Sequence, residues 1–170
     1  MPFVLDTDLH PDIAPLAWLV GRWEGAGIVG YPTMETSHRF GQEILCSHDG
    51  RPFLRWESRT WLLDEDGEVV RQSGTELGFW RVTEPDATGA NTELLLTHPT
   101  GIVEMYAGTA EPARVRLATD GVMRSPHAKA YAAATRLYGY VEGNLMWVMD
   151  MAAMGVELTS HVSAELKRVD

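Results

Sequence analysis

The chain has 170 residues, of which 45% are apolar, with six tryptophans, one cysteine and a formal net charge of −10. A chain of this length forms one domain with room for a core or a ligand cavity, without disulfides or a structural metal. Because 24 acidic residues outnumber 14 basic ones, the overall field repels phosphate backbones and anionic membranes. The sequence therefore predicts a single domain, residues 1–170, with no nucleic-acid partner and no membrane partner.

The start of the chain and the cysteine usage both bear on the compartment. The first ten residues carry two aspartates and no basic residue, unlike a signal peptide, and no apolar run approaches the roughly 18 residues of a membrane span. The lone Cys46 excludes an internal disulfide and a cysteine-rich metal site, as is typical of a reducing compartment. We expect a cytoplasmic protein.

The segment 11–20 is where apolar residues recur at helical spacing, at Ile13, Leu16 and Leu19. It is short, contains two prolines and is followed by Gly21, so it predicts one or two turns of helix that lead into a strand.

After this segment, apolar and β-branched runs alternate with turn signals rich in Gly, Pro and Asp, one of which is Thr119-Asp-Gly121. About ten strands are predicted on this basis. Their ranges are 22–29, 35–48, 53–63, 68–82, 92–97, 102–109, 112–120, 130–141, 145–151 and 158–169.

Ten strands are too many for one flat sheet, and closure removes the exposed edges. We therefore expect an all-β fold, a ten-stranded antiparallel up-and-down β-barrel with a short N-terminal helical segment. A two-sheet sandwich with Greek-key links is the competing architecture, but it needs longer crossing connections, and the longest loop candidate is around 84–91. A barrel of this size has room for a small molecule.

The six histidines are candidate ligands for a metal. They are scattered, at positions 10, 38, 48, 98, 127 and 161, without the spacing of a zinc site. A haem iron needs only one neutral imidazole, because the porphyrin supplies four nitrogens. His48 and His98 fall in turn signals and are expected in solvent, whereas His161 lies within the last strand. Strand alternation groups His161 with Thr159 and Glu165, so alternation alone places His161 in water as well.

Cys46 and the glycine-rich segment 21–27 can each be explained by packing rather than by chemistry. Cys46 and His48 would share one face of a strand, and a packed thiol is favoured there over a Cys/His nucleophile. In Gly21-Arg-Trp-Glu-Gly-Ala-Gly27, Gly25 and Gly27 would clear a strand face for close approach of another group, while Trp23 plugs the barrel end.

This glycine-rich segment also resembles the Gly-x-Trp-x-Gly-x-Gly motif of the nitrobindin family, at Gly21, Trp23, Gly25 and Gly27. Nitrobindins are haem-binding ten-stranded β-barrels, similar in shape to fatty-acid-binding proteins. Further segments match the family in order along nearly the whole chain. These are Gly30-Tyr-Pro-Thr33, Gly101-Ile-Val-Glu-Met105, Ala128-Lys129 and Ser160-His-Val-Ser-Ala-Glu-Leu-Lys-Arg168.

The resemblance implies one haem b per chain with ferric iron, with His161 as the axial ligand and with Thr33 and Lys129 beside the porphyrin. It implies isomerisation of peroxynitrite to nitrate and binding of nitric oxide, for scavenging or sensing, and it implies no distal histidine. His161 must then face inward, either because the polar face of the last strand lines a mixed cavity or because a local bulge turns the ring.

The alternative function, from a different class, is a non-enzymatic carrier of an apolar ligand in the same barrel. The sequence does not determine the oligomeric state, and a homodimer stays open.

Overall fold

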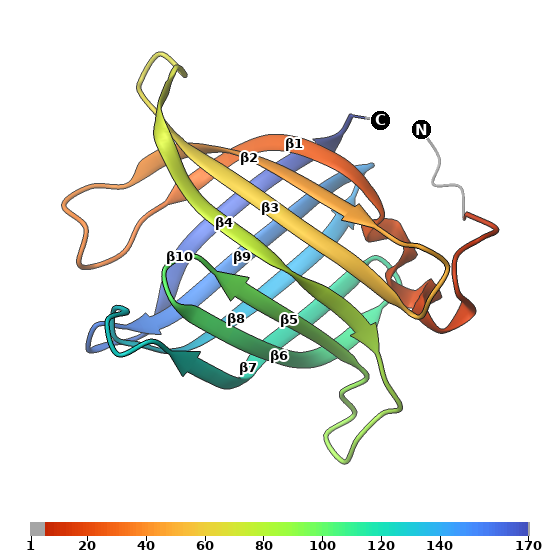
Figure 1. Ribbon diagram of the computed structural model, residues 1–170. Helices are drawn as coiled ribbons and strands as arrows, with labels where there is room; N and C mark the ends of the chain where they lie inside the picture. The colour runs from red at the N-terminus through yellow and green to blue at the C-terminus, as the bar shows by residue number, and fades with distance from the viewer. Residues whose placement is uncertain (1–5, 170) are drawn as a thin grey trace.

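The computed structural model describes residues 6–169, which form one short helix followed by ten strands (Figure 1). The elements are η1 (Pro11–Leu19), β1 (Gly21–Val29), β2 (His38–Ser47), β3 (Phe53–Leu63), β4 (Val69–Val82), β5 (Thr92–His98), β6 (Ile102–Glu111), β7 (Arg114–Arg124), β8 (Tyr131–Val141), β9 (Asn144–Ala153) and β10 (Val156–Arg168). The helical segment and the ten strands predicted from the sequence are confirmed. No helix within residues 6–169 is long and apolar enough to cross a membrane.

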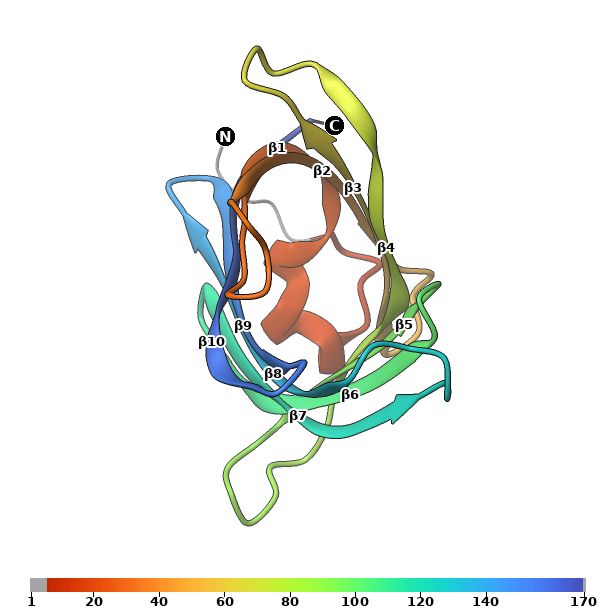
Figure 2. The same cartoon turned by 90° about the vertical axis from the view of Figure 1, so that its left-hand side faces the viewer.

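The sheet is a closed antiparallel barrel. Each strand pairs with its neighbour in sequence, and β1 also pairs with β10, which joins the two ends of the sheet. The up-and-down barrel is therefore confirmed over the sandwich. Figure 2 shows the ring of strands from the end opposite η1, with η1 lying across the far end.

Close approach of the backbones of β1 and β10 depends on glycine. A Cβ atom at Gly25 would lie 2.1 Å from the carbonyl oxygen of Glu165, and one at Gly27 would lie 2.1 Å from that of Ser163. Both distances are far below van der Waals contact, so a larger residue would push the closing strand pair apart.

The core fills the half of the barrel next to η1. Ile13 and Leu16 of η1 are fully buried, and so is Trp23, whose indole N–H donates to the carbonyl of Leu19 at 2.9 Å. This hydrogen bond ties β1 to η1 and satisfies the indole nitrogen at the closed end of the barrel.

An aromatic cluster lies deeper in the core. Trp56, Trp80 and Tyr138 meet edge to face with ring centroids 5.4–5.6 Å apart, and Tyr138 stacks on Trp147 at 5.4 Å. These rings come from β3, β4, β8 and β9, and they pack the four strands against one another inside the barrel.

The predicted turn at Thr119-Asp-Gly121 is wrong, because β7 runs through it. Met105 pairs with Gly121 and Tyr106 pairs with Thr119, so Asp120 is an extra residue on β7, which makes a β-bulge. A bulge and a turn both use Asp and Gly to bend the backbone locally, so the same residues produce both signals.

Candidate functional site

A cavity of about 300 Å³ occupies the half of the barrel away from η1. It extends to the loop between β5 and β6, where Pro99 and Thr100 line it and are exposed. One wall, from the ends of β1, β9 and β10, combines apolar side chains with one histidine; the facing wall is polar. The apolar residues of the first wall are Val29, Met149, Met151 and Val162, and the histidine is His161.

A β-bulge in β10 turns His161 into this cavity. Ser160 pairs with Asp150 and Val162 pairs with Met149, so His161 is the extra residue on β10. His161 and Val162 therefore both line the cavity, although they are adjacent in sequence. The placement of His161 in water, expected from alternation, is wrong, and the bulge is the reason.

The imidazole of His161 is oriented by the backbone of Gly30. Its Nδ1 lies 2.9 Å from the carbonyl oxygen of Gly30, which can only accept, so Nδ1 carries the proton and Nε2 keeps its lone pair. The edge-to-face contact with Tyr31, at 5.4 Å, packs the ring from the side. Burial lowers the pKa of His161, and the charge of Arg136 lowers it further, against the opposing effect of the Gly30 bond. The cavity thus contains a neutral, oriented imidazole with one available nitrogen.

Thr33 and Lys129 lie in loops at the same end of the barrel, but neither lines the cavity. Thr33 is exposed, with its hydroxyl 4.0 Å from the sulfur of Met154. Lys129 is exposed, and its backbone carbonyl accepts from the Arg124 guanidinium at 3.3 Å. Their placement beside a porphyrin stays a prediction.

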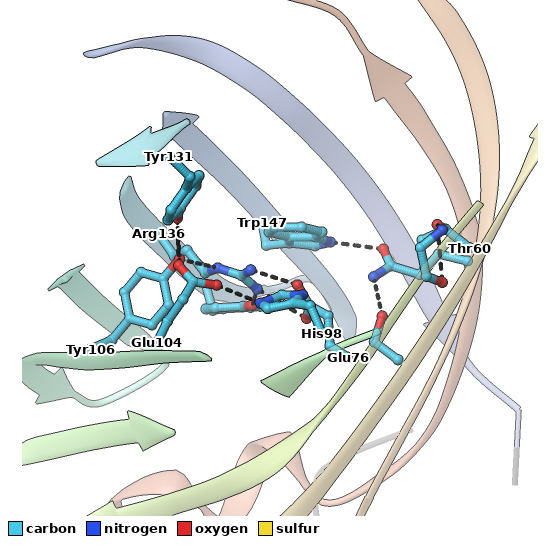
Figure 3. Close-up of polar contacts among 12 residues, drawn as sticks. Thr60, Glu76, His98, Glu104, Tyr106, Tyr131, Arg136 and Trp147 are labelled. Atoms are coloured by element: carbon cyan, nitrogen blue, oxygen red, sulfur yellow. Dashed lines mark hydrogen bonds and ion pairs between the residues drawn. The ribbon is translucent and has the colours of Figure 1, made fainter. Parts of the chain in front are cut away.

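An ion pair joins β8, the strand next to β9, to the facing wall. The guanidinium of Arg136 on β8 makes two hydrogen bonds to the Glu76 carboxylate on β4, at 2.5 and 3.1 Å (Figure 3). It also donates to the hydroxyls of Tyr106 and Tyr138, at 3.1 and 2.9 Å. Burial raises the pKa of Glu76, but the adjacent Arg136 outweighs it and the net shift is downward. Both groups are therefore charged.

A second buried carboxylate, Glu104 on β6, continues this network. It is 2% exposed and accepts hydrogen bonds from Nε2 of His98 at 2.5 Å, from the Tyr106 hydroxyl at 2.6 Å and from the Tyr131 hydroxyl (Figure 3). Burial opposes its ionisation, but His98, the charge of Arg136 and the two hydroxyls outweigh burial and lower the pKa of Glu104 to about 2. Glu104 is therefore ionised inside the barrel.

The expectation that His98 and His48 lie in solvent is wrong. The His98 side chain is 17% exposed and lines the cavity, because it is the last residue of β5 and points inward to Glu104. The His48 side chain is 10% exposed and contacts the Asp6 carboxylate at 2.8 Å. Cys46 is a packed thiol, and burial raises its pKa well above the ordinary value, so it is a poor nucleophile.

Comparison with known proteins gives the family. A model of the THAP4-like, heme-binding beta-barrel domain matches residues 12–168. The chain belongs to this family. It is 48% identical to a peroxynitrite isomerase from Nocardioides sp. and 45% identical to a ferric nitrobindin-like protein from Kineococcus radiotolerans, in each case over 99% of both chains. The nitrobindin resemblance drawn from the motifs is confirmed.

A solved structure resembles this member of the family throughout. The crystal structure of Rv2717c from M. tuberculosis is similar with a TM-score of 0.81 at 30% identity, over 95% of this chain and 99% of that one. The likeness therefore covers the whole barrel, including the strands that carry the cavity.

The cavity of this THAP4-like barrel fits the haem in the family's description. A haem protein provides an axial side-chain donor and an apolar environment for the porphyrin. The free Nε2 of His161 is such a donor, and the thioethers of Met149 and Met151 supply adaptable apolar surface on the neighbouring strand. The fit rests on the orientation of the imidazole together with this lining.

The polar network of the facing wall was missed by sequence reasoning, although a signal for it exists. Glu104 lies two residues before the buried Tyr106 on β6, and Arg136 lies two residues before the buried Tyr138 on β8. A charged residue in the inward phase of a barrel strand indicates a buried polar cluster, because an unpaired charge there is costly.

Proposed function

We propose that this chain binds one haem b through Nε2 of His161 and isomerises peroxynitrite to nitrate. The observation that carries the proposal is the hydrogen bond from Nδ1 of His161 to the Gly30 carbonyl, which leaves Nε2 of a neutral, cavity-lining imidazole with a free lone pair. A backbone carbonyl that accepts from the other ring nitrogen fixes the tautomer and the orientation of metal-ligating histidines. The peroxynitrite isomerase name of a relative 48% identical over the full length supports the reaction.

When bound, the haem iron supplies the redox chemistry that cleaves and rearranges the O–O bond of peroxynitrite. The side chains do the rest. Gly30 and Tyr31 keep the His161 ring in place, so the axial nitrogen needs no reorganisation. The aromatic cluster and η1 close the deep end of the barrel, so a substrate enters and leaves through the loop end. The walls of the cavity would confine the substrate and limit its contact with water.

We propose nitric oxide as a second ligand of the same cavity, either scavenged or sensed. The support is the ferric nitrobindin-like name of a relative and the Nε2 of His161, which would hold the haem iron that binds such a ligand. Thr33 and Lys129 would contact the edge of the porphyrin from the loops, with the Lys129 ammonium pairing with a propionate.

A carrier of an apolar anion is the competing function, and one contact argues against it. Such a carrier needs a buried cation that is free to pair with the ligand's carboxylate. Arg136 is the buried arginine of the cavity, and Glu76 already occupies it with two hydrogen bonds. The cavity is therefore better matched to a ligand held by His161.

The activity is tested by mixing peroxynitrite with haem-loaded protein in a stopped-flow instrument and measuring nitrate and nitrite at the end. The proposal predicts faster decay than with the haem-free protein, and nitrate as the product. Decay at the same rate with and without haem, or a product dominated by nitrite, would contradict it.

A further inference from the structure

His98 and Glu104 form a hydrogen-bonded pair in the wall across the cavity from His161. In the closed ring of ten strands, β5 with His98 lies directly opposite β10 with His161. Both histidines line the same cavity, from opposite sides of the ring of strands.

The tautomer of His98 is fixed by its partner. An ionised carboxylate only accepts hydrogen bonds, so Nε2 of His98 carries the proton that it shares with Glu104 at 2.5 Å. Within residues 6–169 no group is hydrogen-bonded to Nδ1 of His98, which therefore has a free lone pair. The pair has the arrangement of a base and the carboxylate that orients it.

The carboxylate beside His98 is not paired with the buried arginine. Arg136 is balanced by Glu76, with which it forms two hydrogen bonds. Glu104 is bonded to two neutral tyrosine hydroxyls and to His98, so its negative charge has no full cation in direct contact. An imidazolium at His98 would supply that cation, and it would form next to the carboxylate.

We propose that His98 accepts the proton that a small, weakly acidic ligand loses when it binds in the haem pocket, with Glu104 as its positioning residue. The inference rests on the proposed haem function and differs from the family resemblance, which implies no distal histidine. It names the substrate class as acids of the form H–O–O–X, including peroxynitrous acid and hydroperoxides. The O–H bond breaks, its electron pair stays with the ligand anion, and the proton goes to Nδ1; nothing is oxidised or reduced.

Hydrogen cyanide is the probe, because it is a weak acid that binds ferric haem as an anion. Its H–C bond breaks, and the proton goes either to a base in the pocket or to bulk solvent. At pH 7 the haem-loaded protein is mixed with cyanide, and two quantities are measured: the association rate, from the Soret band, and the protons released to solvent, from a pH indicator.

The proposal predicts almost no proton release for the natural protein and about one proton per haem for His98→Leu. The association rate of His98→Leu should fall about 100-fold, the size of a typical general-base contribution. The matched control, His127→Leu, removes an exposed histidine of the β7–β8 loop that does not line the cavity, and should behave like the natural protein. If His98→Leu does not fold, His98→Gln replaces it, since an amide can still donate to Glu104 but cannot accept the proton.

Glu104→Gln separates positioning from proton transfer. Its amide oxygen still accepts from Nε2 of His98, but it lacks the charge that stabilises the imidazolium. The rate should fall by about tenfold, with partial proton release.

Each other outcome overturns the proposal and identifies what failed. Equal rates and equal proton release in the natural protein and His98→Leu overturn the role of His98 while leaving haem binding intact. Loss of the Soret band in His98→Leu and His98→Gln would make His98 part of the haem attachment. No Soret band in the natural protein overturns the proposed function as well.

Discussion

Gly30 and His161 hold each other through two hydrogen bonds that run in opposite directions. The backbone N–H of Gly30 donates to the carbonyl of His161 at 2.9 Å, and Nδ1 of His161 donates to the carbonyl of Gly30 at 2.9 Å. The first bond extends the pairing of β1 with β10 that closes the barrel, and the second orients the imidazole. Nε2 of His161, the nitrogen that we propose as the haem ligand, is therefore positioned by the same strand pair that closes the fold.

Gly25→Ala should destabilise the barrel by about 3 kcal/mol, because the added Cβ would lie 2.1 Å from the Glu165 carbonyl. Urea unfolding followed by tryptophan fluorescence measures this change. Gly121→Ala is the matched control, since a Cβ there would meet nothing within 4 Å, and it should change stability by about 0.5 kcal/mol or less. Equal effects of the two substitutions would contradict the role given to Gly25.

Breaking the ion pair between Glu76 and Arg136 should lower the free energy of unfolding by about 3–5 kcal/mol, because either single substitution leaves a buried charge without its partner. Urea unfolding gives the free energy of unfolding of Arg136→Met, of Glu76→Gln and of the double variant. The double variant should be less destabilised than the sum of the single variants, and strict additivity would contradict a direct coupling.

The carboxylate of Glu104 should make the fold sensitive to acid. Its pKa is about 2 in the folded chain, against an ordinary value of 4.5, so it stabilises the fold fully above pH 4.5. That contribution is lost as the pH falls from about 4.5 to about 2. Urea unfolding at several pH values should show a shallower dependence for Glu104→Gln over this window. An unchanged dependence would indicate that Glu104 is not held ionised.

Lys129→Ala should weaken haem affinity about two- to fivefold at low salt, the size of an exposed ion pair, and the difference should shrink at high salt. The affinity is measured by transfer of haem to a competing apoprotein. Lys167→Ala, an exposed lysine near the closed end of β10, is the control of equal charge. Equal losses of haem affinity in both variants would indicate a general effect of net charge and would contradict a contact between Lys129 and the haem.

The number of strands and the closure of the barrel could be predicted from the sequence, because alternation and turn residues are local signals. Alternation could not locate the bulges, because each depends on the partner strand; the bulge at His161 was one of two alternatives that the family resemblance left open. Asp120 looked like part of a turn, and His161 looked solvent-facing, since one extra residue reverses the faces of a strand. The motif resemblance implies an inward-facing His161, and the structure places this side chain in the cavity, whereas alternation places it in water.

The polar wall was beyond sequence reasoning for a related reason. Its members come from four different strands, and their contacts depend on the register around half of the barrel. The residues are Glu76 on β4, His98 on β5, Glu104 and Tyr106 on β6, and Tyr131 and Arg136 on β8. Pairing of this kind is visible only once the strands are placed.

The most direct test of the account is a titration of haem b into the haem-free protein and into His161→Ala, followed by the Soret band, with His127→Ala as the control. The account predicts saturation at one haem per chain for the natural protein and the control, and loss or gross alteration of the band for His161→Ala. An unchanged affinity and spectrum in His161→Ala would contradict the assignment of His161 as the axial ligand.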